Sequence, residues 1–482
     1  MSIQLHFPES LIRKTLLREA RGECAAEVKL MIPSVIHPER PVAVKLAVLD
    51  DRGLPVASGT ASVTVFLPDG NGGPTSQSVE FFADQPAVCR IEGVCFPKPG
   101  FVRLEAEFEG RTVVSNPALV TTEDRPQILW GDPHIHTVLS DCHPERCRSR
   151  VLAYSAARYA YGFDFVAIAD HVSGGKRGTT GKWLDNLAMA DLFNDPPNFS
   201  ALLAYEASMP GGQGGDNNVY LAEPRMKYLE PGAEKWTVRE LAEELDAGDF
   251  LVPHHTSRAN KHGEIPPALY PGELRMPVIE IHSKWGCSEY RGHPDSLDDP
   301  HDGPAYAQDL LSYGYRLGFI GGTDTHTSLT FCQALEPEHI RHRPGLTAVR
   351  CAENQPGTIH NAIRSRNCYA ACGERIFLDT DCDDLAMGQV KTAPRPGAPR
   401  RISVRCAAES AIETIEIVRN GTCVHSVSPN DWKAECEWTD VEPLEAVALR
   451  DATDQNPFVY YYVRITTASG ARAWSSPCWF LH

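Results

Sequence analysis

Residues 163–171 read FDFVAIADH, an apolar run that ends on an acidic residue and a histidine. The run follows a helical repeat of apolar residues over 151–161 and a glycine at position 162. A short apolar strand that comes directly after a helix is typical of a parallel sheet with helical crossovers. The stretch therefore predicts an α/β fold. Its last residue, His171, is expected at the carboxyl end of a strand, where side chains from several strands open onto one face.

The same alternation of strands and helices continues from about residue 126 to residue 375. Thr237 and Glu240 have the spacing of a capping box, which predicts a helix that ends near Gly248 and leads into a strand at 250–252. The other elements predicted from apolar patterns are strands at 277–281, 318–321 and 345–351, and helices at 305–317 and 358–369. We therefore assign this region to one α/β domain.

Both flanks of this domain predict antiparallel sheet. Apolar and polar residues alternate at 42–48, 61–65 and 102–108, as in strands with one buried face. Later in the chain, an Asn-Gly pair at 420–421 separates two alternating segments, which is a strong hairpin pattern. The predicted domains are a β-sandwich over 1–125, the α/β domain over 126–375 and a second β-sandwich over 376–482.

The chain has 46 Lys and Arg residues against 63 Asp and Glu residues, a net charge of -17. This negative charge argues against a nucleic-acid backbone or an anionic membrane as the main partner, so a small-molecule substrate is expected. The first residues resemble no signal peptide, and no stretch approaches the roughly 18 apolar residues of a membrane span. We therefore expect a cytoplasmic protein without membrane contact, and the oligomeric state stays open.

The 15 cysteines are an odd number and include no Cys-x-x-Cys pair, so most of them are expected to be reduced. Cys368 and Cys372 lie four residues apart on a predicted helix. We interpret these two as small core residues, with a minor metal or redox site as the alternative.

Histidines and carboxylates collect at the ends of the predicted strands. His134 and His136 are two residues apart, so an extended strand points both imidazoles to the same side, where they can chelate one ion. Asp324 and His326 repeat this spacing with oxygen and nitrogen ligands, a mixture suited to Zn, Mn or Fe. The other candidate ligands are Asp141, His171, Glu206, His254 and His255. A lone histidine at a strand end is more often structural, but this ordered series predicts a metal site.

The order of these motifs resembles the PHP superfamily, the polymerase and histidinol phosphatase type of metal-dependent phosphoesterase. The resemblance covers about residues 128–375 and implies a distorted, TIM-like βα barrel with up to three metal ions. The positions that match the family's motifs are His134, His136, Asp141, Asp170, His171, Glu206, Asp324 and His326. Glu206 matches the bridging glutamate, and the family's His-Pro motif falls on either His254 or His255.

The sequence departs from this family at one expected ligand. The family usually has a further histidine shortly after the glutamate, and this sequence offers Asp216 in the corresponding stretch. The number of ions, two or three, therefore stays open. A closer resemblance is to an uncharacterised branch of the superfamily, through segments similar to 253–256, 280–283 and 366–376. This branch supports the fold and the metal site but implies no substrate.

The ligand set predicts a hydrolytic mechanism. Two or three divalent ions would lower the pKa of a bridging water toward neutrality, and the resulting hydroxide would attack phosphorus or a carbonyl carbon. We expect Glu206 to bridge two ions and Asp324 to orient the water or receive its proton. The resemblance implies a small phosphoester as substrate. The alternatives are hydrolysis of an amide, lactam or ester, since related metal barrels use similar ligands, and a non-catalytic binding protein with a degenerate barrel.

Five further residues are candidates for catalysis or substrate contact. His282, Lys284 and Glu289 follow the strand predicted at 277–281, and they could bind an anionic substrate or donate a proton, with a structural role as the alternative. Lys176 and Arg177 belong to a Gly-rich segment and could clamp a phosphate or carboxylate. The sequence has neither a Gly-x-Ser-x-Gly elbow nor a Walker A motif, so serine-hydrolase and P-loop mechanisms are not expected.

Overall fold

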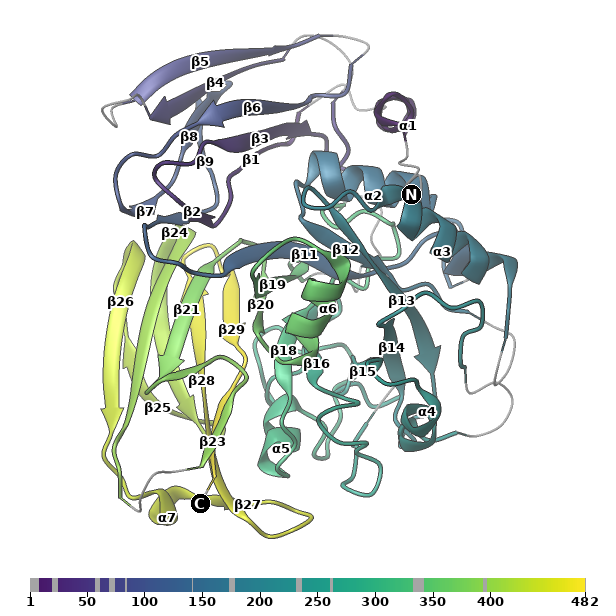
Figure 1. The fold of residues 1–482 in the computed structure, drawn as a ribbon, viewed down its shortest axis with the longest axis vertical. Helices are drawn as coiled ribbons and strands as arrows, with labels where there is room; N and C mark the ends of the chain where they lie inside the picture. The colour runs from purple at the N-terminus through teal and green to yellow at the C-terminus, as the bar shows by residue number, and fades with distance from the viewer. Residues whose placement is uncertain are drawn as a thin grey trace.

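The computed structural model describes residues 8–19, 25–56, 61–68, 74–82, 85–140, 142–172, 178–230, 236–260, 263–332, 342–392 and 397–481. Figure 1 shows three groups of elements: a sheet-rich N-terminal part at the top, a mixed central part at the right and long C-terminal strands at the lower left. Among the described helices, none combines the length and the apolar character required to span a lipid bilayer.

The N-terminal part is built from small sheets. Its elements are α1 (Glu9–Glu19), β1 (Glu27–Met31), β2 (Val35–Ile36), β3 (Val42–Leu49), β4 (Ala61–Pro68), β5 (Pro74–Phe81), β6 (Val88–Val94), β7 (Gly100–Val102), β8 (Glu105–Phe108), β9 (Arg111–Val114) and β10 (Ala118–Val120). The sheets have the orders β1-β3-β6, β2-β10-β7 and β5-β4-β8-β9. The strands predicted at 42–48 and 61–65 are confirmed as β3 and β4, and alternate side chains of both strands share one core.

The segment 102–108, predicted as one strand, belongs to two sheets. β7 ends at Val102 and pairs with β10, whereas β8 begins at Glu105 and pairs with β4. Between them, the N–H of Leu104 donates to Oγ of Ser115 (2.9 Å). The alternation therefore identifies the buried face correctly but does not reveal that the chain crosses from one sheet to the other.

The central part alternates strands with helices. Its elements are β11 (Gln127–Ile135), a 3-10 helix (Val138–Ser140), α2 (Arg150–Ser155), a π-helix (Ala156–Ala160), β12 (Phe165–Ile168), α3 (Gly181–Phe193), β13 (Ser200–Ser208), β14 (Asp216–Leu221), α4 (Val238–Glu244), β15 (Phe250–Pro253), β16 (Val278–Ser283), β17 (Gly286–Cys287), α5 (Ala307–Ser312), β18 (Gly318–Gly321), β19 (Gly345–Cys351), α6 (Pro356–Arg364) and β20 (Cys368–Cys372).

The pairing of the central strands is mixed. β12 is parallel to β11 and β13, and β16 is parallel to β18. β14 and β19 run antiparallel to their neighbours. Ile135 of β11 and Thr325, beyond the end of β18, are joined by an isolated parallel bridge. The predicted alternation of strands and helices is confirmed, but these pairings do not show a closed TIM-like barrel.

Local interactions explain where the central helices begin. α2 follows Ser149, whose Oγ accepts a hydrogen bond from the N–H of Leu152 (3.3 Å). The capping box predicted for α4 is confirmed, because Thr237 Oγ1 accepts from the N–H of Glu240 (3.2 Å) and Glu240 Oε2 accepts from the N–H of Thr237 (2.7 Å). Helices α5 and α6 are shorter than predicted, and α3 was not predicted.

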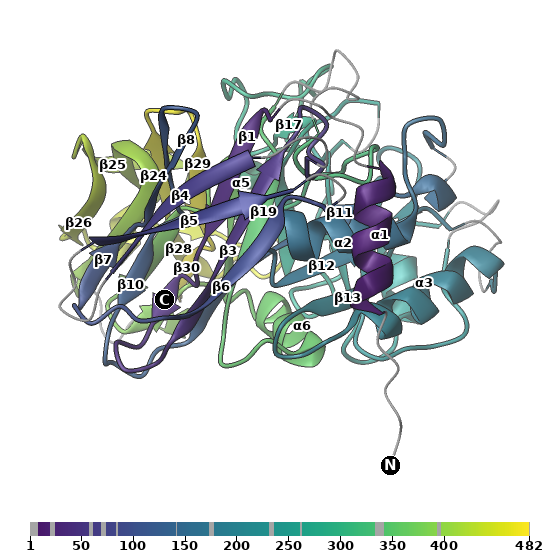
Figure 2. The same ribbon diagram turned by 90° about the horizontal axis from the view of Figure 1, so that it is seen from above.

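Helix α1 packs against the central part. Figures 1 and 2 show α1 beside α2 in both views, and the buried side chains of Ile12 and Leu16 share a core with Leu152. This contact joins the start of the described chain to the α/β elements.

The C-terminal part consists mainly of long antiparallel strands. Its elements are β21 (Phe377–Cys382), β22 (Leu385–Ala386), β23 (Val390–Thr392), β24 (Arg400–Arg419), β25 (Thr422–Val427), β26 (Asp431–Asp440), α7 (Leu444–Val447), β27 (Leu449–Arg450), β28 (Pro457–Thr467), β29 (Arg472–Ser475) and β30 (Cys478–Leu481). β24 is 20 residues long and pairs with β21, β25, β26 and β28. The predicted hairpin joins β24 to β25 through Asn420 (φ 49°) and Gly421 (φ 79°), the positive φ values that such a tight turn requires.

Cys368 and Cys372 are the first and last residues of β20, so the predicted helix at these positions is wrong. β20 pairs antiparallel with β19 on one side and with β29 on the other. All five residues of β20 are buried. The interpretation of both cysteines as small core residues agrees with this burial, and the sheet runs without interruption from the central part into the C-terminal part.

Candidate metal centre

The predicted metal ligands converge at one end of the central strands. His134 is in β11, Glu206 is in β13, and each of the remaining residues follows the end of β11 or of another strand. These remaining residues are His136, His171, His254, His255, Asp324 and His326. Asp216 is the first residue of β14. It lies near the other residues because antiparallel pairing places it opposite Ser208, the last residue of β13. The side chains are buried except for that of His171, which is 31% exposed.

Four residues, His134, His136, Glu206 and Asp324, form a first ligand group. The Nε2 atoms of the two histidines lie 3.2 Å apart. Oε2 of Glu206 lies 3.5 Å from His134 Nε2 and 3.1 Å from His136 Nε2. Oδ1 of Asp324 lies 3.5 Å and 3.0 Å from the same two nitrogens. Zn–N bonds of about 2.0–2.1 Å place tetrahedral ligands about 3.3 Å apart, so these five separations match those of ligands around one ion.

The second oxygens of both carboxylates face other histidines. Oε1 of Glu206 lies 3.2 Å from Nε2 of His254, and Oδ2 of Asp324 lies 2.6 Å from Nε2 of His255. Asp216 brings a carboxylate oxygen within 4.8 Å of ligand atoms of Glu206 and His254. Glu206 and Asp324 each direct one oxygen to the first ligand group and the other to these residues. We call the residues on this side, His254, His255 and Asp216 with the same two carboxylates, the second ligand group.

A third ligand group contains a cysteine that sequence reasoning missed. Ligand atoms of Cys142, His136 and His326 lie within 4.8 Å of one another. His171 is adjacent, with Nε2 3.5 Å from Oε2 of Glu206. Burial works to raise the pKa of the Cys142 thiol, but the nearby imidazoles of His171 and His326 outweigh it and lower the pKa to about 5. The third ligand group thus combines nitrogen with an acidic thiol.

Buried acceptors orient the imidazoles of the first ligand group. Nδ1 of His134 lies 3.0 Å from Oε2 of Glu280, and Nδ1 of His136 lies 2.8 Å from Oγ of Ser140. A metal-binding imidazole commonly donates its other N–H to such an acceptor, which fixes the tautomer and the ring orientation. This arrangement leaves the lone pairs of both Nε2 atoms directed into the first ligand group.

Two buried aspartates hold the surrounding loops. Oδ1 and Oδ2 of Asp170 accept hydrogen bonds from the N–H and the hydroxyl of Thr137 (both 2.6 Å), and Oδ2 also accepts from Nη2 of Arg150 (2.7 Å). Oδ2 of Asp132 accepts from the hydroxyl of Thr323 (2.6 Å). Asp170 therefore fixes the segment after β11, and Asp132 fixes the segment after β18.

Neighbouring histidines lower the pKa values of Glu206 and Asp324. Burial alone would raise these values, but positive charge on the nearby imidazoles holds the pKa of both carboxyl groups well below the usual range. Conversely, burial alone would lower the pKa values of His134 and His136, but the carboxylates around them raise both well above the usual value. Buried negative charge requires compensation. Protonation of both His134 and His136 at Nε2 would place two positive charges 3.2 Å apart, whereas one cation between the ligands compensates the carboxylates without this repulsion.

Other predicted site residues do not join these ligand groups. His282 Nε2 lies 3.0 Å from the carbonyl oxygen of Arg343, its ring stacks on Trp474 with centroids 5.6 Å apart, and burial lowers its pKa to about 4. Lys284 is buried, and its Nζ donates to the carbonyl of Cys332 (2.9 Å). The predicted residues that lie outside the described part of the chain are Asp141, Lys176 and Arg177.

The residues that sequence reasoning missed are Glu280, Ser140 and Cys142. Glu280 is a carboxylate inside the otherwise apolar beginning of β16, and an ionisable residue at a buried position needs a partner. Ser140 and Cys142 lie on either side of the predicted ligand at position 141. Their roles depend on how the loop folds, for which the sequence has no pattern.

Another group of ligand-type side chains lies against the C-terminal strands, and its members are Cys287, Glu289 and His293. Oε1 of Glu289 accepts from Nη1 of Arg464 and from the hydroxyl of Tyr462 (both 2.6 Å), and Oε2 accepts from Nε1 of Trp474 (2.7 Å). These bonds satisfy the carboxylate and connect the residues after β17 to β28 and β29. We therefore interpret this group as structural.

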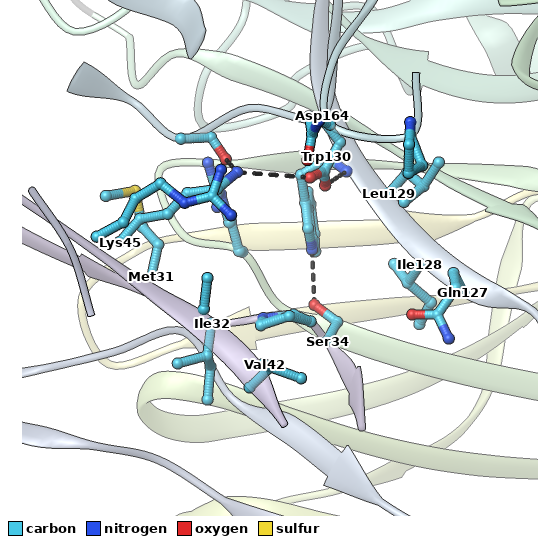
Figure 3. Close-up of a pocket in the computed structure, with 17 residues that line it drawn as sticks. Met31, Ile32, Ser34, Val42, Lys45, Gln127, Ile128, Leu129, Trp130 and Asp164 are labelled. Atoms are coloured by element: carbon cyan, nitrogen blue, oxygen red, sulfur yellow. Dashed lines mark hydrogen bonds and ion pairs between the residues drawn. The ribbon is translucent and has the colours of Figure 1, made fainter. Parts of the chain in front are cut away.

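The cavity in Figure 3 is separate from the ligand groups. It has a volume of about 240 Å³ and lies between the N-terminal strands and the beginnings of β11 and β12. Trp130 Nε1 donates to Ser34 Oγ (2.9 Å) in its wall, and Nζ of Lys45 lies 3.7 Å from Oδ1 of Asp164. No member of the three ligand groups lines this cavity, whose described contacts join the N-terminal and central parts.

Comparison with known proteins gives relatives of unknown activity. No protein-family profile matches the chain. Two relatives are uncharacterized proteins of Chlamydia muridarum and Chlamydia trachomatis, each 28% identical, over 417 and 415 residues respectively. Both alignments cover 83% of this chain, and the chain spans about 65% of the length of these relatives.

Solved structures show only weak likeness. A two-domain protein of Bacteroides vulgatus that contains a predicted PHP-like metal-dependent phosphoesterase is 15% identical with a TM-score of 0.36, over 71% of this chain and 92% of that chain. A β-glucuronidase of Parabacteroides merdae is 10% identical with a TM-score of 0.19, over 95% of this chain and 64% of that chain.

Proposed function

We propose that the chain is a metal-dependent hydrolase of small phosphoesters, with a PHP-type distorted barrel around the metal centre. The observation that carries the proposal is the geometry of the first ligand group, in which two nitrogens and two carboxylate oxygens are separated by distances typical of ligands around one ion. The motif order, which resembles the PHP superfamily, supports a phosphoester as the substrate class. A small phosphoester is anionic and is repelled by the net charge of -17, so bound metal ions would supply the local positive charge that attracts it.

The donor set fits at least two divalent ions. The first ion would be held by His134, His136, Glu206 and Asp324, and the second by Asp216, Glu206, His254, His255 and Asp324. Imidazole and carboxylate ligands in this mixture suit Zn, Mn or Fe. When bound, these ions would supply Lewis-acid activation of water and charge stabilisation for the phosphoryl group.

The residues of the chain position and enclose the reaction. Asp324 contacts both ligand groups, so we propose that it orients the attacking water between them. Trp285 covers the centre, since its ring lies 5.6 Å from those of His255 and His326 and its Nε1 donates to the carbonyl of Asp324 (3.2 Å). Substrate would approach from the side of His171, the partly exposed member of the set.

Metal content and hydrolysis of model substrates test the proposal. We expect wild-type protein to purify with more than one equivalent of transition metal and to hydrolyse phosphate esters faster than carboxylic esters. The double variant His134→Ala, His136→Ala should lose most of the metal, because these residues supply adjacent ligands to one ion. The matched control is His425→Ala in β25, which should keep both metal and activity.

Metal-free wild-type protein with full stability and activity would overturn the metal centre. Hydrolysis of amides or carboxylic esters in preference to phosphate esters would overturn the substrate class and favour an amidohydrolase-type activity. Bound metal without hydrolysis of either class would favour a binding protein.

A further inference from the structure

Cys142 brings a thiol to the rim of the metal centre. Its ligand atom lies within 4.8 Å of ring nitrogens of His136 and His326. The residue is half-buried, between the 3-10 helix that carries Ser140 and helix α2. A thiol at this distance from two imidazoles has the ligand chemistry of a nitrogen and sulfur metal site.

The neighbouring imidazoles are aligned with one another. The ring of His136 stacks on that of His171, with centroids 5.1 Å apart and planes inclined by 21°, and on that of His326, with centroids 4.6 Å apart and planes inclined by 16°. The roughly parallel rings of three histidines from three loops therefore occupy one small region beside the cysteine.

Nδ1 of His326 is a buried ring nitrogen that could still bind a ligand. Its residue is 6% exposed, and among the described residues its Nδ1 has no hydrogen-bond partner. The same Nδ1 lies 4.0 Å from Oδ1 of Asp324. A buried imidazole nitrogen normally has a partner, so this atom is an independent indication of a ligand at the site.

We propose that Cys142 is a thiolate ligand of the metal centre and that it forms, with His171 and His326, a sulfur-containing site for Zn or Fe(II). This inference rests on the proposed metal-dependent function and adds a third ion to it. Glu206 would lie beside this ion as well, because its Oε2 lies 3.5 Å from Nε2 of His171. A thiolate ligand favours Zn and Fe(II) over Mn and Mg at this position. The ion binds the deprotonated thiol, so the sulfur–metal bond forms without a change in oxidation state.

Cobalt substitution tests the inference by a spectroscopic readout. Metal-free protein would be loaded with Co(II), and we expect a near-ultraviolet thiolate-to-cobalt charge-transfer band in the wild type. Cys142→Ser should lose this band and about one equivalent of cobalt while it keeps the cobalt held by His134 and His136. The matched control is Cys287→Ser, a thiol in the group that we interpret as structural, which should keep the band.

Alkylation gives a second readout that does not depend on activity. Zinc should protect Cys142 from iodoacetamide, as measured by mass spectrometry, and metal-free protein should be alkylated at this position. Cobalt binding without a charge-transfer band, or a band that survives Cys142→Ser, would overturn this inference alone. Failure of the wild type to bind cobalt at all would instead overturn the proposed metal-dependent function.

Discussion

His255 Nε2 lies 2.6 Å from Asp324 Oδ2, and both residues have left-handed backbone conformations, with φ values of 55° and 50°. This conformation costs a residue other than glycine about 1–2 kcal/mol. The N–H of Asp324 donates to the carbonyl of His134 (2.9 Å), which helps to hold the conformation. The strained backbone therefore lies where the first and second ligand groups meet, and such strain often marks functional sites.

Replacing His255 separates its ligand role from its backbone strain. His255→Gly and His255→Ala both remove the imidazole, but only alanine keeps a Cβ at a φ of 55°. We expect metal-free His255→Gly to be more stable than metal-free His255→Ala by about 1 kcal/mol. Urea unfolding in the presence of a chelator measures this difference. Equal unfolding midpoints would mean that the backbone at position 255 relaxes when the imidazole is absent.

Glu206→Gln should reduce activity without unfolding the protein. The side chain keeps its size, but a neutral amide cannot hold two cations close together, so we expect turnover to fall by at least about a hundredfold. Steady-state kinetics measures turnover, metal analysis measures metal content, and circular dichroism measures folding. The control is Glu435→Gln, an exposed position in β26. An unfolded Glu206→Gln protein with unchanged metal content would identify Glu206 as structural.

Asp216 is predicted to influence which metal is bound. It is buried, and its carboxylate lies near ligand atoms of Glu206 and His254. A carboxylate is a harder ligand than imidazole, so Asp216→His should shift the preference from Mn or Fe toward Zn, and Asp216→Ala should lose one ion. Metal titrations followed by elemental analysis measure both effects. Unchanged stoichiometry and preference in both variants would exclude Asp216 as a ligand.

His360 should make stability fall with decreasing pH. Burial lowers its pKa from 6.5 to about 4, and its ring packs 4.7 Å from that of Phe250, away from the ligand groups. The unfolded chain therefore binds more protons than the folded protein between these pH values. The free energy of unfolding should fall by up to about 3 kcal/mol as the pH drops through this window.

His360→Gln should reduce this loss, because glutamine does not titrate. Urea unfolding of both proteins at pH 7 and pH 4 isolates the contribution of His360 from that of the other histidines. The same pH dependence in both proteins would contradict the prediction.

Local sequence patterns predicted the strands well where a short apolar run has a turn at each end. The strands predicted at 318–321 and 345–351 coincide with β18 and β19. β20 was missed because an apolar run of five residues is compatible with either a helix or a strand. Its pairing with β19 and β29 decides between them.

The convergence of most candidate ligands could be predicted, because they lie near or just beyond the carboxyl ends of strands and the carboxyl ends of neighbouring strands meet. The contact between His134 and Glu280 could not be predicted in this way, since 146 positions separate the two residues and their meeting depends on how β16 approaches β11. Cys142 lies in a loop whose course depends on tertiary contacts such as those of Ser140 with His136 and His171.

The position of β20 has a consequence for any attempt to isolate the central part. A protein that ended near residue 375 would lose β29, and one side of β20 would expose unpaired N–H and C=O groups together with buried residues of the sheet interior. An exposed apolar edge strand is a template for aggregation. The C-terminal strands thus cover this edge, and we expect the solubility of the central part to depend on a segment whose described residues include no member of the three ligand groups.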